Sequence, residues 1–197
     1  MIPLWFKLAY TGFVGLVLAF WLRHYGWRNL LWFSDIALIG AVPALWLESA
    51  PIASVLAVAV FGPELLWNLD FAFRLLSGYR GPGLTSYMFE RERPLVLRLL
   101  SLFHVPLPAV LLWLLHAHGY AAAVALPGAV VLAALVLPAS RVFGSAEANI
   151  NWTYGLARTQ ERLSPVAYVA LLFAGFVLVV FVPTDWLLRR LFAIAAA

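Results

Sequence analysis

The sequence predicts an all-α fold, a bundle of helices that crosses the lipid bilayer about six times. Of its 197 residues, 64% are hydrophobic and only 11% are charged, whereas soluble domains contain about 25% charged residues. The mean hydropathy is +0.94, and apolar runs recur close to the ~20 residues that a helix needs to cross the hydrocarbon core. This composition fits a protein dissolved in lipid rather than in water.

The helices are expected in a single transmembrane domain that covers residues 1–197. The predicted spans are approximately residues 3–22, 30–47, 52–73, 95–115, 121–138 and 165–182. Two polar loops, 78–94 and 141–164, separate the apolar runs, and a short terminal helix is expected over 184–194. The fourth run contains Pro106 and Pro108, which remove backbone hydrogen bonds and should kink or unwind it.

Missing residue types exclude several chemistries. The chain contains no cysteine, which rules out disulfides, thiolate metal sites and thiol nucleophiles. Its only lysine, Lys7, lies near a helix end, so a Schiff base in mid-membrane has no candidate. Lys7 also interrupts the first apolar run and no small-x-small cleavage site follows, so we expect a retained first helix rather than a signal peptide.

The basic residues predict how the chain is oriented. Because the arginines lie between apolar runs, the net charge of +4 needs no nucleic-acid partner to explain it. One side of a six-span topology receives ten arginines: Arg23, Arg28, Arg74, Arg80, Arg91, Arg93, Arg98, Arg141, Arg158 and Arg162. The other side receives only Lys7, Arg189 and Arg190. The positive-inside rule therefore places loops 78–94 and 141–164 in the cytoplasm and both termini outside, as expected for a bacterial inner-membrane protein with periplasmic termini.

This topology is testable with reporter fusions. A reporter that is active only in the cytoplasm should be inactive at the C-terminus and active when inserted in loop 78–94. Cytoplasmic activity of the C-terminal fusion would contradict the topology.

Ionisable residues inside the predicted spans are the first candidates for function, because each is costly in hydrocarbon unless it is paired or hydrated. Glu64, Asp70 and His104 are the catalytic candidates, the carboxylates as bases and the histidine as a base or metal ligand. Asp35 is expected roughly 8 Å, and His104 roughly 14 Å, from the cytoplasmic end of their helices. The third run has the opposite direction, which puts Glu64 near or just past mid-membrane. The polar positions therefore share one leaflet.

The third run carries these side chains as a stripe. Glu64 and Asn68 are i,i+4 neighbours, Asp70 and Arg74 form another such pair, and Trp67 lies between the two rows. The simplest interpretation of Asp70 and Arg74 is an ion pair at the membrane boundary. Glu64 has no basic residue within one turn, so it is neutral, bonded to another helix or bound to a cation.

Each of the other polar positions also has a structural interpretation. His104 precedes the proline break, where a cavity opens in some membrane helices, but an interhelical hydrogen bond explains it equally well. Asp35 lies near a helix end, where it could simply contact water. His116 and His118 are roughly 18 Å from His104 along a regular helix, so no metal or other cofactor is assigned.

The second loop contains the polar and aromatic tract NINWTY. We expect it to act as a lid that contacts a ligand. Most tryptophans lie toward helix ends as interfacial anchors, namely Trp5, Trp21, Trp27, Trp32, Trp46, Trp113 and Trp186. Only Trp67 and Trp152 are placed to contact a ligand. The expected ligand-binding residues are Asp35, Trp67, Asn68, Arg74, Asn149, Asn151 and Trp152.

The tracts ELLWNLDFAFRLL, RLLSLFH and ANINWTYG resemble segments of uncharacterised bacterial multi-pass integral membrane proteins, over most of residues 30–185. This resemblance implies a family with no assigned activity. Ser101-x-x-His104 with the later histidine pair is also faintly similar to alkaline-ceramidase-type membrane hydrolases, which place a Ser, an Asp and three His around zinc. The chain departs from them in helix number, in histidine spacing and in lacking a late intramembrane histidine, so their activity is not carried over.

Three functions are compatible with these patterns. The leading hypothesis is a one-sided polar cavity in the cytoplasmic leaflet, lidded by residues 141–164, that binds or modifies a lipid-like substrate. The first alternative is a small transporter or channel for a solute, an ion or protons, in which proline-broken helices supply the site. The second is a non-catalytic subunit whose charged stripe pairs with a partner in the membrane. Whether the chain is an enzyme stays open at this point.

Overall fold

The computed structural model describes residues 2–78, 83–156 and 158–194, and the all-α fold is confirmed, since these residues form helices and no strand. The α-helices are α1 (Leu4–His24), α2 (Phe33–Trp46), α3 (Ala50–Ser77), α4 (Leu95–Leu100), α5 (Leu107–His118), α6 (Ala122–Phe143), α7 (Pro165–Gly175) and α8 (Val182–Ile194). Short 3₁₀ turns are η1 (Trp27–Leu31), η2 (Ser86–Phe89), η3 (Ser101–His104) and η4 (Ile150–Trp152), and η5 (Phe176–Phe181) is a π-helical segment.

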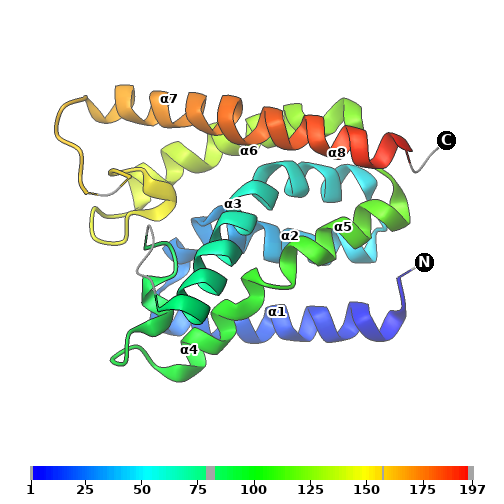
Figure 1. The fold of residues 1–197 in the computed structure, drawn as a ribbon, viewed down its shortest axis with the longest axis horizontal. Helices are drawn as coiled ribbons and strands as arrows, with labels where there is room; N and C mark the ends of the chain where they lie inside the picture. The colour runs from blue at the N-terminus through cyan, green and yellow to red at the C-terminus, as the bar shows by residue number, and fades with distance from the viewer. Residues whose placement is uncertain (1, 79–82, 157, 195–197) are drawn as a thin grey trace.

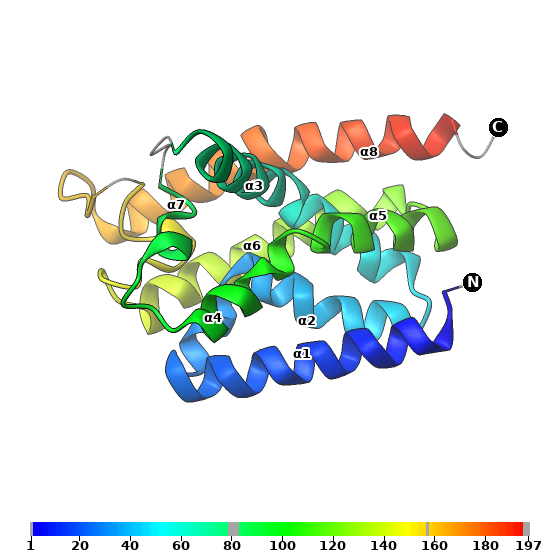
Figure 2. The ribbon, with the colours of Figure 1, turned by 60° about the horizontal axis from the view of Figure 1, so that its bottom comes forward.

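Within the described residues, five helical runs are long and apolar enough to cross a membrane. They are Leu4–His24, Ala50–Ser77, Leu95–His118, Ala122–Phe143 and Pro165–Phe192. The apolar helix α2 has only 14 residues, roughly 21 Å at the usual rise. The chain runs back and forth along one bundle axis, with both termini at one end and the loops after α3 and α6 at the other (Figures 1 and 2). Multiple passes through a membrane therefore match both the composition and the shape.

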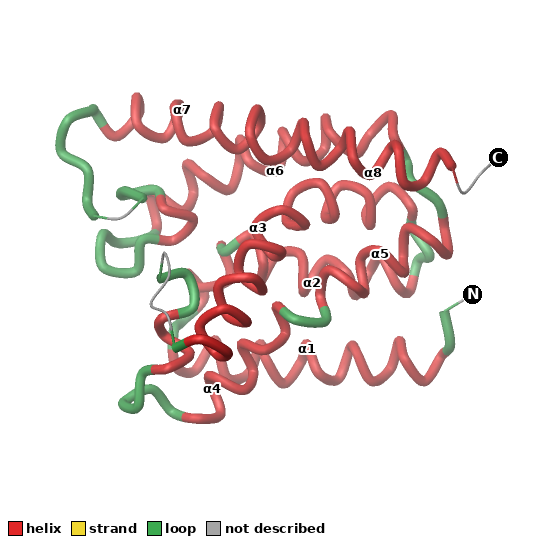
Figure 3. Tube along the Cα trace, viewed as in Figure 1, coloured by secondary structure: helices red, strands yellow, loops and turns green. Residues whose placement is uncertain are grey.

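Local sequence signals define the helix ends. Ser49 caps α3 by accepting a hydrogen bond from the Ile52 backbone N–H at 3.3 Å, and Gly78 ends it in the left-handed conformation at φ 67°. Ser164 caps α7 in the same way, because its Oγ accepts from the Ala167 N–H at 3.2 Å. The connections between these helices are loops and short turns (Figure 3).

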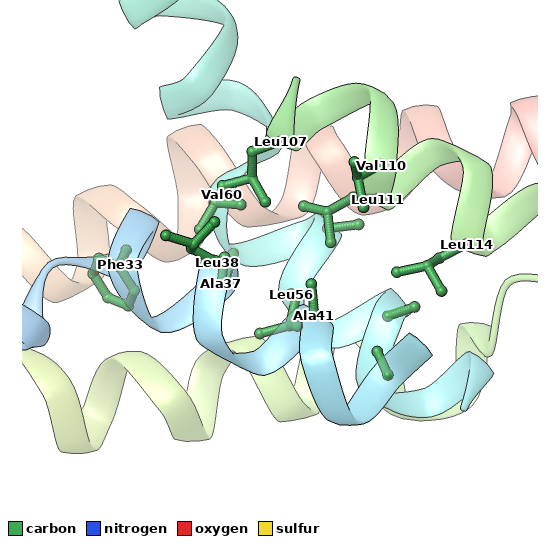
Figure 4. Close-up of a cluster of buried hydrophobic side chains, with 14 of the residues drawn as sticks. Phe33, Ala37, Leu38, Ala41, Leu56, Val60, Leu107, Val110, Leu111 and Leu114 are labelled. Carbon is green, nitrogen blue, oxygen red and sulfur yellow. The ribbon is translucent and has the colours of Figure 1, made fainter. Parts of the chain in front are cut away.

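The long helix α3 lies at the centre of the bundle and packs against α2, α5 and α6. Apolar side chains from α2, α3 and α5 interlock along it, among them Leu38, Leu56, Val60, Leu107 and Leu111 (Figure 4). Leu111 and Leu114 are fully buried. The buried Glu64, Trp67 and Asp70 of its polar stripe therefore face other parts of the protein rather than lipid.

The fourth predicted span, residues 95–115, is interrupted next to Pro106 and Pro108, as the sequence predicts. α4 passes into the tight turn η3, and α5 begins only at Leu107, directly after Pro106. Neither Pro106 nor Pro108 can donate a backbone hydrogen bond, so the helix cannot continue regularly through this point. The break places His104 at the end of η3, beside α3.

Several boundaries differ from the sequence-based expectation. The second span, expected over 30–47, is the helix Phe33–Trp46, and the third, expected over 52–73, is Ala50–Ser77. The predicted span 165–182 and the predicted terminal helix 184–194 form one continuous run, because the π-helical segment η5 joins α7 to α8 at Val182. A wide π turn is a common way to accommodate an irregular position inside a helix. Helix α6 also extends to Phe143, so the second loop begins at Gly144 rather than at 141.

Helix α6 approaches α3 closely at Gly128. A Cβ atom built on Gly128 would overlap a methyl group of Val55, which is short and branched and cannot swing away. We expect Gly128→Ala to lower the free energy of unfolding by about 1–3 kcal/mol through overpacking.

Gly12 in α1 is the matched control, since no atom lies within 4 Å of its Cβ position. Gly12→Ala should be neutral or stabilising by up to about 1 kcal/mol. Unfolding in mixed micelles measures both variants, and equal stabilities would contradict the close approach.

Candidate functional site

A carboxylate and an imidazole meet inside the bundle. His104 Nδ1 lies 2.8 Å from Glu64 Oε2. The Glu64 side chain is 2% exposed and the His104 side chain 13% exposed. Residues 40 apart in sequence therefore form a nearly enclosed hydrogen-bonded pair, which the η3 turn makes possible by bringing His104 against α3.

Asn68 joins the two partners through the backbone. Its Nδ2 donates to the Glu64 carbonyl oxygen on its own helix and to the His104 carbonyl oxygen across the interface, both at 2.8 Å. The carbonyl of His104 lies in the broken segment, where the regular helical ladder is interrupted. Asn68 thus supplies a donor at the break and ties it to α3.

Trp67 holds the imidazole plane. Its ring stacks on His104 with centroids 4.5 Å apart and an interplanar angle of 19°. The indole N–H donates to the Tyr87 hydroxyl at 3.2 Å. Stacking and the Glu64 contact together fix both the tilt and the rotation of the His104 ring.

Tyr87 connects the site to the first loop. Burial raises the pKa of its hydroxyl to about 12, although the hydrogen bond from Trp67 lowers it in part. The phenol is therefore neutral at physiological pH. Sequence reasoning missed Tyr87, because a loop residue 20 positions from Trp67 shares no periodic pattern with α3.

Asp35 has hydrogen-bond partners of its own and lies within electrostatic range of Glu64. Its carboxylate accepts from Trp21 Nε1 at 2.9 Å and from Asn29 Nδ2 at 3.1 Å. Asp35 is 3% exposed and Trp21 is also 3% exposed. Trp21 is thus an interior donor, so its expected role as an interfacial anchor is wrong, and Asp35 has protein partners instead of water.

Asp70 and Arg74 do not form the expected ion pair with each other. Asp70 Oδ2 accepts from the backbone N–H and the hydroxyl of Thr85, at 2.9 and 2.7 Å. The Arg74 guanidinium instead lies 4.9 Å from the centre of the Phe89 ring. Both side chains therefore contact the segment that follows α3 instead of each other. Asp70 anchors residues 85–89 to α3.

The tract in the second loop is used by the protein itself. Asn151 accepts from the Phe33 N–H at 3.2 Å and donates to the Leu31 carbonyl at 2.7 Å and to Ser140 Oγ at 2.9 Å. Asn149 bonds to the backbone of Tyr154 and Gly155.

Trp152, one of the two aromatic residues of this tract, is half-buried. It packs edge-on against Trp32 and tilted against Phe176 of η5. Asn151 and Trp152 thus fasten the loop to neighbouring elements, whereas Asn149 shapes the loop itself.

The opposite end of the bundle contains two further polar contacts. Lys7 Nζ lies 2.8 Å from Glu48 Oε1 and joins α1 to the α2–α3 link. This contact lowers the pKa of the Glu48 carboxyl. The Tyr120 hydroxyl donates to Asp185, which also pairs with Arg189 at 2.7 Å, so α8 is attached to the α5–α6 link.

No group of three or more His, Asp or Glu side chains that could hold a metal ion occurs among the described residues. His104 has one carboxylate partner, and His116 and His118 lie at the other end of α5. Comparisons with protein-family models, with curated proteins and with solved structures find no significant match to the chain. Function must therefore be argued from the Glu64–His104 site.

The structural role of Asn151 gives a prediction. Asn151 has a left-handed backbone at φ 51°, and its amide makes three hydrogen bonds. Asn151→Gly keeps the backbone conformation accessible but leaves the buried Phe33 N–H without its acceptor, so we expect a loss of about 1–3 kcal/mol.

Asn151→Ala should cost roughly 1–2 kcal/mol more, because alanine is strained in the left-handed region. Detergent unfolding measures both variants, with the exposed Glu147→Ala as control. If Asn151→Gly is as stable as the wild type, the Asn151 amide does not support the fold and is free to bind a ligand.

Proposed function

We propose that the chain is a bacterial inner-membrane protein whose Glu64–His104 pair binds a lipid-like substrate and transfers a proton to or from it. The single observation that carries this proposal is the 2.8 Å contact between His104 Nδ1 and Glu64 Oε2. An imidazole oriented by a buried carboxylate is the usual arrangement of a general base.

The contact determines which nitrogen acts. When Glu64 is ionised, Nδ1–H donates to it and the lone pair of the neutral ring lies on Nε2. Nε2 has no hydrogen-bond partner among the described residues and is not one of their enclosed, unpaired polar atoms. It is therefore the atom of the pair that a substrate can reach, while Glu64 stays behind it.

The surroundings of His104 favour an apolar substrate. Val105, next to it, is 48% exposed, and Leu65 and Leu69 on α3 are 42% and 65% exposed. In a bilayer these side chains contact acyl chains. A substrate that approaches His104 from this surface arrives through lipid, which supports a lipid-like molecule rather than a water-soluble one.

The packing of the core supports a one-sided site over a conduit. Between the Glu64–His104 pair and the Lys7–Glu48 end, the interior is filled by apolar side chains such as Leu111 and Leu114, both fully buried (Figure 4). An ion or proton path would need polar groups or water through this layer. We therefore prefer acid–base chemistry or binding in one leaflet over transport.

The orientation follows from the arginine distribution. We place the end that carries loops 78–94 and 144–164 in the cytoplasm and both termini in the periplasm. The site would then draw its substrate from the cytoplasmic leaflet.

The test compares cells that lack the gene and are complemented with wild-type or variant protein. Glu64→Gln and His104→Ala should each return the lipid profile to that of the deletion strain, and turnover by purified protein should fall by about 10²–10⁴-fold, the usual contribution of a general base. The double variant should be no worse than either single variant, since the two side chains act as a unit.

His116→Ala, an exposed histidine of the same helical run, is the matched control and should leave the lipid profile unchanged. An identical lipid profile in deletion and wild-type cells would refute the proposal. Proton or ion flux in proteoliposomes that is lost on Glu64→Gln would establish the conduit instead.

A further inference from the structure

A second site lies on the outside of the bundle, between α6 and α7. A groove of about 490 Å³ opens there, a volume within the range of small-ligand sites. It is lined by Ala134, Pro138, Arg141, Val142, Pro165, Val166, Val169, Ala170 and Phe173. All but one of these side chains are apolar, and the exception is a cation.

Arg141 lies at the loop end of the groove, in the last turn of α6. Its guanidinium stacks on the Tyr154 ring, 3.8 Å from the ring centre. The Tyr154 hydroxyl donates in turn to the backbone carbonyls of Arg141 and Gly144, so the ring is fixed to the end of the helix. The stack therefore holds the guanidinium in one plane.

One of these donors has no acceptor. Arg141 Nη1 is enclosed and makes no hydrogen bond among the described residues. A buried charged donor without a partner is costly, and an absent water, ion or ligand is one explanation for it. The carboxylates of the same loop, Glu147 and Glu161, are exposed and do not line the groove.

The two ends of the groove thus require different chemistry from one occupant. The apolar end, which includes Ala134 and Phe173, needs an apolar chain, and the loop end needs an anionic oxygen within reach of a planar cation. Arg141 follows Ala134 by seven positions, which corresponds to roughly 10 Å along α6. An anionic amphiphile matches this pattern of apolar and charged contacts.

We infer that the groove between α6 and α7 is a binding site for an anionic phospholipid, with one acyl chain along the apolar lining and the headgroup phosphate on Arg141. Arginine is well suited to this role, because its planar fork binds phosphate oxygens in a bidentate manner. The site is distinct from the Glu64–His104 pair, since neither residue of that pair lines the groove. It does not depend on the proposed function.

The experiment measures the melting temperature of the detergent-solubilised full chain with added lipid. Phosphatidylglycerol and phosphatidylcholine with identical acyl chains are compared, and inorganic phosphate is added alone in a third arm. Wild type should be stabilised more by phosphatidylglycerol than by phosphatidylcholine and should not respond to inorganic phosphate. Native mass spectrometry should show retained phosphatidylglycerol.

Arg141→Gln should weaken the apparent affinity for phosphatidylglycerol about tenfold or more, as expected for the loss of a charged hydrogen bond. The response to phosphatidylcholine should change less, because the quaternary ammonium of its headgroup offsets the charge of its phosphate. Arg190→Gln is the matched control, because Arg190 also lies over an aromatic ring, that of Trp186 at 5.5 Å, but at the other end of the bundle. This control should behave like wild type.

Ala134→Trp tests the apolar end independently of the arginine. Ala134 is an exposed lining residue, so a large side chain fills the groove without entering the core. It should reduce the retention of phosphatidylglycerol while the melting temperature without lipid stays within a few degrees of wild type.

Three results would overturn the inference. They are equal stabilisation of wild type by the two lipids, an equal response of Arg141→Gln and wild type to phosphatidylglycerol, and stabilisation by inorganic phosphate alone. If Arg141→Gln does not fold, full retention of phosphatidylglycerol by Ala134→Trp would also overturn the inference.

Discussion

The structure depends on one constraint, that a polar group inside hydrocarbon must find its partner within the protein. The buried carboxylates and amides obey it through side chains on other elements. Asp35 uses a tryptophan of α1, Asp70 uses Thr85 of the first loop, and Asn151 reaches the end of η1 and the start of α2. These contacts decide how the helices are placed, because apolar surfaces alone have little preference between lipid and one another.

The same constraint explains why the functional candidate lies where it does. A proline break frees backbone carbonyls, and the carbonyl of His104 is then satisfied by Asn68 from α3. Once His104 is held at the break, its ring reaches Glu64 and stacks on Trp67. The irregular backbone and the acid–base pair are therefore parts of one arrangement, as in other membrane proteins where irregular backbone occurs only inside protein or beside a cavity.

The sequence predicts the parts of this structure that arise from local patterns. Hydropathy predicts the helices, the prolines predict the break before α5, and the spacing of Glu64, Trp67 and Asn68 predicts that they share a face. The sequence also identifies His104 as a candidate site residue, but its pairing with Glu64 is known only from the structure. The contacts of Asp35 with Trp21, and of Asp70 with Thr85, join residues 14 and 15 positions apart through intervening turns. No helical period relates such positions, so these two partners cannot be predicted from the sequence.

The loop tract NINWTY shows a different limit of sequence reasoning. A polar and aromatic composition is typical both of a ligand-binding loop and of a loop that fastens helices together. Positive φ angles at Asn149, Asn151 and Trp152 give this tract a compact shape, and the amide of Asn151 is thereby directed toward residues more than 100 positions away. The direction in which such a side chain points depends on the fold of the whole bundle and cannot be predicted from the neighbouring sequence.

The short helix α2 has a consequence for the elements at its two ends. It begins beside Asp35 and ends beside Glu48, which pairs with Lys7. These two acids are 13 residues apart in the sequence, roughly 20 Å along a helix, whereas the hydrocarbon core is about 30 Å thick. Helix α2 is therefore too short to cross this layer by itself, and the backbone and side chains at its ends must be satisfied by neighbouring parts of the protein.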